Sequence, residues 1–348
     1  MKTIVICGGG TLGHIMPGIA FSKILKQENT KIVFITGVKD KRFDEFINSG
    51  KIDEIYYYDV CGLSRKNPFK NILGFFTNYT SFLKIKQLFK TEKPFLVIGM
   101  GGYISAIVLK AASSLSIKTI LHEQNAVMGL ANKMCLKSVN KVLLTFPIDK
   151  IPNSVVIGNP RLIEASKKTL NKISNHITVL SGSLGSEVIN NTIVDFLKTP
   201  LSTKYFTTLI TGKRYYEEVV KNLGANKDKH FEVMPLSNNI LDIMASSSLI
   251  ISRSGATTIF EIIGLNIPSI LIPSPNVVNN HQYYNALYLH NKKASVLLEE
   301  KDLNIDSLNK NIEYCINNVV IKDNLKKIKD DYLKVSLEGV IENVWWIK

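Results

Sequence analysis

Short apolar runs, each followed by a turn of small residues and then by a helical pattern, recur along the chain. A continuous apolar run of about four to eight residues bounded by turns is typical of a strand buried on both faces. Alternation of such strands with helical segments predicts an α/β fold with parallel sheets. The expected strands are 3–7, 31–36, 95–98, 118–121, 142–144, 155–157, 177–180, 205–210, 231–234, 249–251 and 269–272.

The pattern starts again after the turn Gly158-Asn159-Pro160, which divides the chain into two halves. We expect an N-terminal domain over 1–160, a C-terminal domain over 161–330, and a helix over 331–348 that packs back on the first domain. Each half has two small-residue turns between a strand and a helix, which are 8–13, 99–102, 182–185 and 254–255. This organisation predicts two Rossmann-like domains with parallel sheets that face each other across a cleft.

The first of these turns carries a glycine motif. Gly8, Gly10 and Gly13 fit the G-x-G-x-x-G pattern of dinucleotide-binding loops, between a strand and a helix expected from about Pro17. An NAD-binding unit also needs an acidic residue at the end of the next strand, but that strand ends in Thr-Gly-Val-Lys at 36–39. We therefore interpret the loop as a contact for a diphosphate or a sugar, without a dinucleotide ribose clamp.

Two polar side chains are expected at the carboxyl edge of the first sheet, where α/β sheets bind ligands. His14 lies at the mouth of the first helix, and histidine titrates near neutrality, which suits a general base. The alternative for His14 is an imidazole that bonds only its own loop. Asn125, the last residue of the His-Glu-Gln-Asn stretch at 122–125, can both donate to and accept from a sugar hydroxyl.

The second half has its strongest signal at Ser254-Gly255, between a strand and a helix. Such a turn directs backbone N–H groups and the positive end of the helix dipole at one point, which favours a phosphate. Glu261 lies further along that helix, where its carboxylate could accept both hydrogen bonds of a ribose diol. The alternative is an ordinary strand–helix unit with a solvated glutamate.

The net charge of +14 is compatible with nucleic acid or with an anionic membrane surface. No helix-turn-helix, RNA-binding aromatic motif or zinc spacing supports nucleic acid as a partner. The four cysteines are far apart and form neither a metal spacing nor a dense disulfide framework, which favours a reduced, cytosolic compartment.

The segment 67–93 combines apolar and basic residues at helical spacing. Lys70, Ile72, Phe75 and Phe76 are the residues that we expect to contact a membrane surface. The alternative is a core helix with solvated lysines. No apolar run approaches about 20 residues, so membrane contact is expected to be peripheral.

The motifs occur together in one order, which is more specific than any of them alone. They are 8–17, 122–125, 158–160, 254–256 with Glu261, and His281-Gln282 with Asn285. This order resembles the lipid II-forming peptidoglycan enzymes of glycosyltransferase family 28, and the resemblance covers nearly the whole chain. It implies a GT-B fold and an inverting hexosyltransferase. The implied reaction moves GlcNAc from UDP-GlcNAc to the C4 hydroxyl of the MurNAc-pentapeptide of lipid I.

The resemblance also implies roles for individual residues. His14 is the candidate catalytic base, Glu261 takes the ribose hydroxyls, and the backbone near Ser237 meets the uracil. The implied donor contacts are Thr11, Leu12, Gly13, Asn125, Arg161, Ser183, Ser237, Ser254, Gly255, Ala256, Thr257, Thr258, Glu261, Gln282 and Asn285. The implied acceptor contacts are Thr11, Gly13, His14, Gly101, Gly102 and Tyr103. Leu12 replaces the Gly or Ala usual in the family, and Arg161 stands one place earlier than the usual arginine.

The implied partners are UDP-GlcNAc, lipid I, anionic lipids of the inner leaflet, and cell-wall synthesis proteins. The implied location is the cytoplasmic face of the bacterial cell membrane. Because the chain has no Asp-x-Asp motif, we expect no essential metal ion or other cofactor. Two other enzymes stay open as alternatives, a diacylglycerol glycosyltransferase of the GT-B class and a UDP-GlcNAc 2-epimerase. A non-catalytic module that binds nucleotide sugars is the third alternative.

Overall fold

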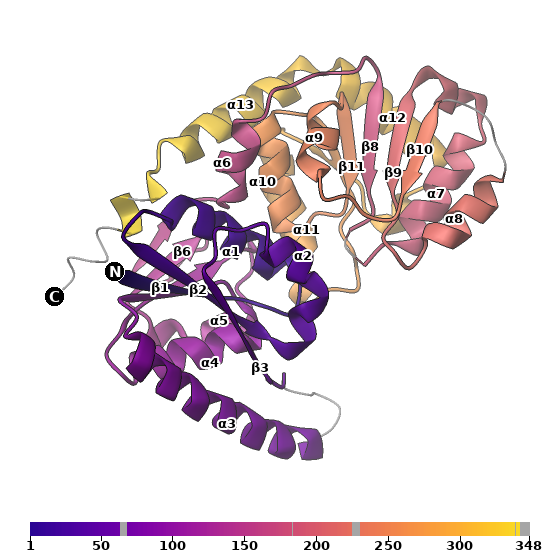
Figure 1. Ribbon diagram of the computed structural model, residues 1–348. Helices are drawn as coiled ribbons and strands as arrows, with labels where there is room; N and C mark the ends of the chain where they lie inside the picture. The colour runs from indigo at the N-terminus through magenta and orange to yellow at the C-terminus, as the bar shows by residue number, and fades with distance from the viewer. Residues whose placement is uncertain (63–67, 183, 225–229, 338, 342–348) are drawn as a thin grey trace. The chain divides into compact units, whose positions relative to one another are not determined.

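The computed structural model describes residues 1–62, 68–182, 184–224, 230–337 and 339–341, with only the backbone for 68–70 (Figure 1). The chain divides into two compact units, one made of Met1–Pro160 with Val335–Lys348, and the other of Arg161–Lys334. Each unit contains one parallel sheet with helices. No helix within the described part of the chain is long and apolar enough to cross a lipid bilayer.

The sheet of the first unit has seven parallel strands in the order β3-β2-β1-β4-β5-β6-β7. The strands are β1 (Lys2–Cys7), β2 (Thr30–Gly37), β3 (Glu54–Tyr58), β4 (Leu96–Gly99), β5 (Lys118–Glu123), β6 (Lys141–Leu144) and β7 (Ser154–Val156). The helices are α1 (Leu12–Leu25), α2 (Asp44–Ile47), α3 (Pro68–Glu92), α4 (Gly102–Ser113) and α5 (Leu130–Lys133). The strand order changes direction between β1 and β4, and such a switch point is where open α/β sheets bind ligands.

Strand β1 is apolar on both faces, and its alternate residues belong to two different cores. Ile4 and Ile6 pack with residues of α1, whereas Val5 and Cys7 pack with residues of α3 and α4. The first core also includes Leu337 and Ile341, which follow α13 near the end of the chain. Helices therefore cover both faces of this sheet, as expected for a parallel sheet.

The sheet of the second unit has six parallel strands in the order β10-β9-β8-β11-β12-β13. The strands are β8 (His176–Leu180), β9 (Phe206–Ile210), β10 (Phe231–Met234), β11 (Leu249–Ser252), β12 (Ser269–Leu271) and β13 (Val296–Leu297). The helices are α6 (Arg161–Ser166), α7 (Glu187–Leu197), α8 (Tyr216–Leu223), α9 (Ile240–Ala245), α10 (Ala256–Leu265), α11 (His281–Asn291), α12 (Ile305–Asn317) and α13 (Val319–Leu333). Strands β8 and β11 are adjacent, so this sheet also has a switch point.

The α/β class and the parallel sheets are confirmed, but one predicted boundary is wrong in a way that matters for the site. Helix α1 begins at Leu12, five residues before Pro17, which lies inside it. Proline is most common in the first turn of a helix, and that preference placed the expected start too late. The earlier start puts Leu12, Gly13 and His14 in the first turn of α1.

Candidate active site

His14 is held at the start of α1 by a contact that fixes its tautomer. Its Nδ1 lies 2.9 Å from the carbonyl oxygen of Gly9. Because a carbonyl oxygen only accepts, Nδ1 carries a proton, and in the neutral ring the lone pair is then on Nε2. A Cβ on Gly101 would lie 3.0 Å from that Nε2 atom, so the ring packs against the loop that follows β4.

The turn before α4 brings two loops together at His14. Gly101 and Gly102 have φ angles of +101° and +81°, which glycine adopts without strain. A Cβ on Gly102 would lie 2.7 Å from the carbonyl oxygen of Gly9, so the loops after β1 and β4 are in direct contact. Helix α4 then begins with no acidic residue and no side-chain cap in its first turn, and Tyr103 is half-buried there.

Asp40 is a functional candidate that the sequence reasoning missed. Its buried carboxylate accepts hydrogen bonds from the Gly10 amide at 3.0 Å, the Thr36 hydroxyl at 3.0 Å and the Gly37 amide at 3.1 Å. The Gly10 amide of the glycine motif is therefore paired inside the protein. An anion at this edge of the sheet would therefore have to bind the backbone amides of the first turn of α1 and not the Gly10 amide. The signal was present, since Asp40 comes one residue after the stretch 36–39.

In the His-Glu-Gln-Asn stretch at 122–125, the first three residues are buried and Asn125 is half-buried. His122 and Glu123 belong to β5, which extends two residues beyond the expected strand. Glu123 Oε1 accepts from the Asn125 amide at 2.9 Å, and Oε2 accepts from Gly129 N at 3.0 Å and Asn132 Nδ2 at 2.7 Å. Glu123 thus fixes the loop that presents Asn125 at the carboxyl edge of the sheet.

His122 is fully buried and neutral. Its Nδ1 lies 3.2 Å from Gln124 Nε2, and its Nε2 lies 3.0 Å from the Thr145 hydroxyl. These contacts fit a ring that accepts at Nδ1 and donates from Nε2. Burial lowers the pKa of His122 to about 4; the hydrogen bond to the Gly158 carbonyl oxygen opposes this shift, and His14 adds to it.

In the second unit, two motifs that are distant in sequence meet at the start of α10. The Ser254 hydroxyl donates to the carbonyl oxygen of Gln282 at 2.8 Å, and Asn285 Nδ2 donates to the carbonyl oxygen of Ser254 at 3.2 Å. Gln282 Oε1 accepts from the Ser274 amide at 2.9 Å. Asn285 is fully buried, so its direct effect is to position Ser254.

The first turn of α10 fits an anion. Its N-cap is Gly255, which has no capping side chain, and no acidic residue lies in the first turn. The Thr257 hydroxyl is buried and has no hydrogen-bond partner among the described residues. Ala256 is buried and Thr258 is half-buried in the same turn. The backbone and hydroxyl donors here match the phosphate site that the sequence predicts.

Glu261 and Arg161 form a buried ion pair. Arg161 Nε and Nη2 donate to Glu261 Oε1 at 2.8 and 2.6 Å, and Nη1 donates to Glu164 at 2.5 Å. Burial raises the pKa of the Glu261 carboxyl above its usual value, and Arg161 opposes that shift. The two residues expected as separate donor contacts are therefore paired with each other in the structure.

Arg253 is a second residue that the sequence reasoning missed. Its Nη1 donates to the carbonyl oxygens of Ile272 and Pro273 at 3.2 and 3.1 Å, and its Nη2 donates to Ser186 Oγ at 2.6 Å. It also contacts Glu300. Ser186 is the N-cap of α7, so Arg253 ties together the loops after β8, β11 and β12. A charged residue inside a turn of small residues was the available signal.

The remaining expected contacts are dispersed. Thr11 and Gly13 are exposed at the start of α1, and Leu12 beside them is half-buried. Ser237 follows β10 and accepts from the Asn239 amide at 3.1 Å. Ser183 and the side chain of Lys70 lie outside the described residues. The expected membrane contacts Ile72, Phe75 and Phe76 are 56%, 66% and 63% exposed.

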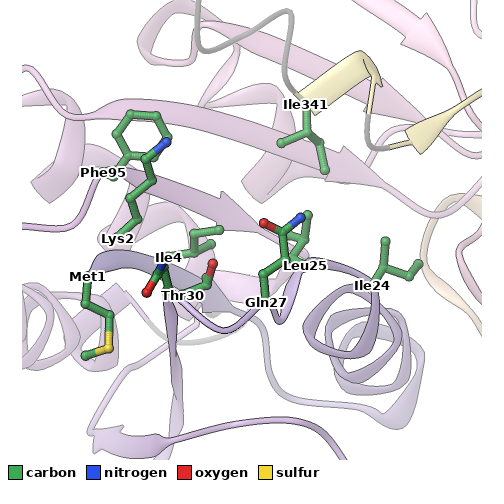
Figure 2. Close-up of a pocket in the computed structure, with 10 residues that line it drawn as sticks. Met1, Lys2, Ile4, Ile24, Leu25, Gln27, Thr30, Phe95 and Ile341 are labelled. Carbon is green, nitrogen blue, oxygen red and sulfur yellow. The ribbon is translucent and has the colours of Figure 1, made fainter.

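A cavity of about 440 Å³ lies at the amino end of β1 (Figure 2). Its lining includes Lys2, Ile4, Phe95 and Ile341. The candidate residues of the first unit follow the carboxyl ends of β1, β4 and β5. This cavity is therefore at the opposite edge of the sheet and is separate from the candidate site.

Two Rossmann-like units, with a phosphate-type turn in the second and a histidine at the switch point of the first, define a glycosyltransferase of the GT-B class. Residues 4–144 match the glycosyltransferase family 28 N-terminal domain, and residues 176–330 match the glycosyltransferase family 28 C-terminal domain. The chain belongs to glycosyltransferase family 28, and the predicted family is confirmed.

Curated relatives match almost the whole chain. A Thermoanaerobacter protein is 35% identical over 359 residues, which cover 98% of this chain and 97% of the relative. A Pediococcus pentosaceus protein is 31% identical over 360 residues, which cover 98% of this chain and 99% of the relative. Both are named UDP-N-acetylglucosamine--N-acetylmuramyl-(pentapeptide) pyrophosphoryl-undecaprenol N-acetylglucosamine transferase.

Solved structures show the same fold. The crystal structure of Acinetobacter baumannii MurG matches with a TM-score of 0.70 and 21% identity, covering 96% of this chain and 100% of that one. The calicheamicin glycosyltransferase CalG4 matches with a TM-score of 0.68 and 11% identity, covering 96% of this chain and 94% of that one. These matches confirm the predicted GT-B fold.

Proposed function

We propose that this protein transfers GlcNAc from UDP-GlcNAc to the C4 hydroxyl of the MurNAc-pentapeptide of lipid I, which gives lipid II for peptidoglycan synthesis. The observation that carries the proposal is the similarity of 31–35% over nearly the full length to relatives named for this transfer. The presence of His14, Asn125, Glu261 and Gln282 in the expected order supports it.

The second unit would hold the donor. The open first turn of α10, with the Ser254 and Thr257 hydroxyls, would bind the diphosphate and stabilise the departing UDP. Glu261 would accept from the ribose hydroxyls while Arg161 holds its Oε1 atom in place. The backbone near Ser237 would meet the uracil.

The Glu261 role has a direct test. Glu261→Ala should mainly raise KM for UDP-GlcNAc, because it removes a binding group and not the base. Titration calorimetry with UDP measures the same contact without turnover. An unchanged UDP affinity would exclude the ribose role.

The first unit would hold the acceptor and the base. The lone pair on His14 Nε2 would take the proton of the C4 hydroxyl as its oxygen attacks C1 of GlcNAc. The bond from C1 to the UDP phosphate oxygen breaks in the same displacement, so the anomeric centre inverts. The first turn of α4, with Gly101, Gly102 and Tyr103, would contact the acceptor diphosphate and sugar.

The reaction is tested by incubating the purified protein and radiolabelled UDP-GlcNAc with lipid I, with diacylglycerol, or with no acceptor. We expect the label in a lipid product with the mass of lipid II, and only in the incubation that contains lipid I. Label in diacylglycerol would favour the other GT-B enzyme, and a change in UDP-GlcNAc without acceptor would favour the epimerase. Binding without any product would favour the non-catalytic module.

Attachment to the cytoplasmic face of the membrane is the second part of the proposal. Phe75 and Phe76 on α3 are mostly exposed, and the chain carries a net charge of +14, which suits anionic lipids. Cell-wall synthesis proteins at the same membrane would be its protein partners.

Flotation with anionic vesicles tests this attachment. Binding at low salt should be lost in the double variant Phe75→Ser with Phe76→Ser. It should persist in the control Val319→Ser with Val320→Ser, since these valines are exposed to a similar extent at 66% and 55%. Equal binding by both variants would exclude the contact through α3.

A further inference from the structure

We propose that a groove between α3 and α4 binds the prenyl chain of the acceptor, at the part of the chain next to the diphosphate. The groove has a volume of about 370 Å³ and a mainly apolar lining, which includes Phe75, Tyr79, Phe82, Tyr103, Ala106 and Ile107. The two helices pack against each other along the first unit (Figure 1). The inference rests on the proposed function, because it assumes a lipid-linked acceptor.

One wall of the groove is a single face of α4. Tyr103, Ala106, Ile107 and Lys110 line it, and their spacing of three, four and seven residues places them on one side of a helix. At about 1.5 Å per residue, this wall is about 10 Å long from Tyr103 to Lys110. Tyr103, Ala106 and Ile107 are half-buried, so the packing of the fold leaves this face partly open.

The groove begins where the acceptor diphosphate is expected. Tyr103 is in the first turn of α4, directly after the two glycines that pack against His14 and Gly9. A prenyl chain is joined to its diphosphate through one oxygen atom. A diphosphate at the start of α4 would therefore place the first carbons of the chain beside Tyr103, at the entrance to an apolar channel.

The side-chain amide of Asn78, which also lines the groove, is already paired. Asn78 Oδ1 accepts from the Cys61 amide at 2.8 Å, and Asn78 Nδ2 donates to the Cys61 carbonyl oxygen at 2.9 Å. The amide therefore does not require a polar ligand, and a hydrocarbon can lie against it without loss of hydrogen bonds. A sugar or a peptide would gain little from the apolar walls.

The groove also reaches the exposed aromatic surface of α3. Phe75 and Tyr79 line it, although they are 66% and 53% exposed, and their rings stack with centroids 6.3 Å apart. Phe75 is itself one of the residues proposed to contact the membrane, and Tyr79 lies four residues further along α3. A chain that enters at Tyr103 can leave the groove beside Phe75 and continue into the lipid phase, so the catalytic edge and the membrane surface are connected.

Ala106→Phe tests the inference, because its ring would occupy the groove from the half-buried side of α4. The substrates are two soluble lipid I analogues with the same sugar and peptide, one with a methyl group on the diphosphate and one with a short prenyl chain. We expect kcat/KM to fall by about tenfold to a hundredfold for the prenyl analogue only, since several buried CH₂ groups lose their contacts. KM for UDP-GlcNAc should not change.

Leu83→Ser is the matched control, because Leu83 is exposed on α3 but does not line the groove. It should leave the ratio of the two acceptors unchanged. Equal losses on both analogues in Ala106→Phe, or no loss on either, would overturn the inference. A loss that follows the peptide stem and not the prenyl chain would also overturn it and would assign the groove to the peptide.

A binding experiment without turnover gives an independent answer. Wild-type protein should bind farnesyl diphosphate more tightly than inorganic diphosphate in calorimetry, and Ala106→Leu should reduce that difference with little change to the fold. Equal affinities for the two probes would overturn the inference. If lipid I were not a substrate but the difference persisted, the proposed acceptor would be wrong and the prenyl groove would remain supported.

Discussion

The buried pair of Arg161 and Glu261 makes a prediction about stability. Their side chains are 5% and 6% exposed, and both contacts to Glu261 Oε1 are shorter than 3 Å at 2.8 and 2.6 Å. Arg161→Met removes the cation and leaves a buried carboxylate without its partner. Removing one member of a buried pair costs about 3–5 kcal/mol. For a unit of this size, that loss lowers Tm by about 6–20 °C.

The loss of stability in Arg161→Met should depend on pH in a defined direction. Burial already raises the pKa of Glu261, and without Arg161 nothing in the pair opposes the shift. A carboxyl whose pKa is higher in the folded state stabilises the fold at low pH and loses that contribution as pH rises through the raised value. The variant should therefore be closest to wild type at mildly acidic pH and furthest from it at neutral pH.

Thermal unfolding followed by circular dichroism at several pH values measures both effects. Glu164→Gln is the control, because Glu164 is the half-exposed partner of Arg161 and should contribute only about 0–1 kcal/mol. Adding Glu261→Gln to Arg161→Met should restore much of the lost stability at neutral pH. A defect below about 1 kcal/mol that does not vary with pH would refute the reasoning about an uncompensated charge.

Three further predictions concern single side chains. His14→Ala should lower kcat by about 10²- to 10⁴-fold and leave UDP affinity unchanged, so a variant that keeps most of its kcat would exclude His14 as the base. Arg253→Lys should raise KM for UDP-GlcNAc about tenfold or more, because lysine loses a forked contact worth about 1.5–3 kcal/mol; an unaltered KM would contradict the positioning role. Wild-type protein should lose roughly 3 kcal/mol as pH falls from 6.5 to about 4, because His122 is protonated in the unfolded chain but stays neutral in the fold. The free energy of unfolding, measured with urea, should change less with pH in His122→Asn than in the wild-type protein. The same pH dependence in both proteins would contradict this.

The architecture could be predicted because its signals are local. Apolar runs such as 249–251 and turns such as Ser254-Gly255 depend on neighbouring residues, and the structure forms β11 and α10 there. Strand β3 was not predicted because Glu-Ile-Tyr-Tyr-Tyr is half-buried at the edge of the sheet and lacks a continuous apolar run. Proline at position 17 gave a misleading local signal for the start of α1.

The partners of the site residues could not be predicted, since they are set by distant parts of the chain. Arg161 and Glu261 are 100 residues apart, and no local spacing indicates that they pair. Asp40 reaches the Gly10 amide only because β1 and β2 are neighbours in the sheet. Composition and spacing therefore gave the candidate site residues, whereas the sheet order determined which groups these residues contact.

The placement of Leu337 and Ile341 in the core around β1 has a consequence for biosynthesis. A ribosome completes Met1–Pro160 long before it adds these two apolar residues, and translation of the intervening segment takes about 10–40 seconds. During that interval the nascent amino-terminal unit is without part of its interior and exposes apolar surface that chaperones can recognise. Cotranslational folding of the amino-terminal unit thus waits until Leu337 and Ile341 have left the ribosomal exit tunnel.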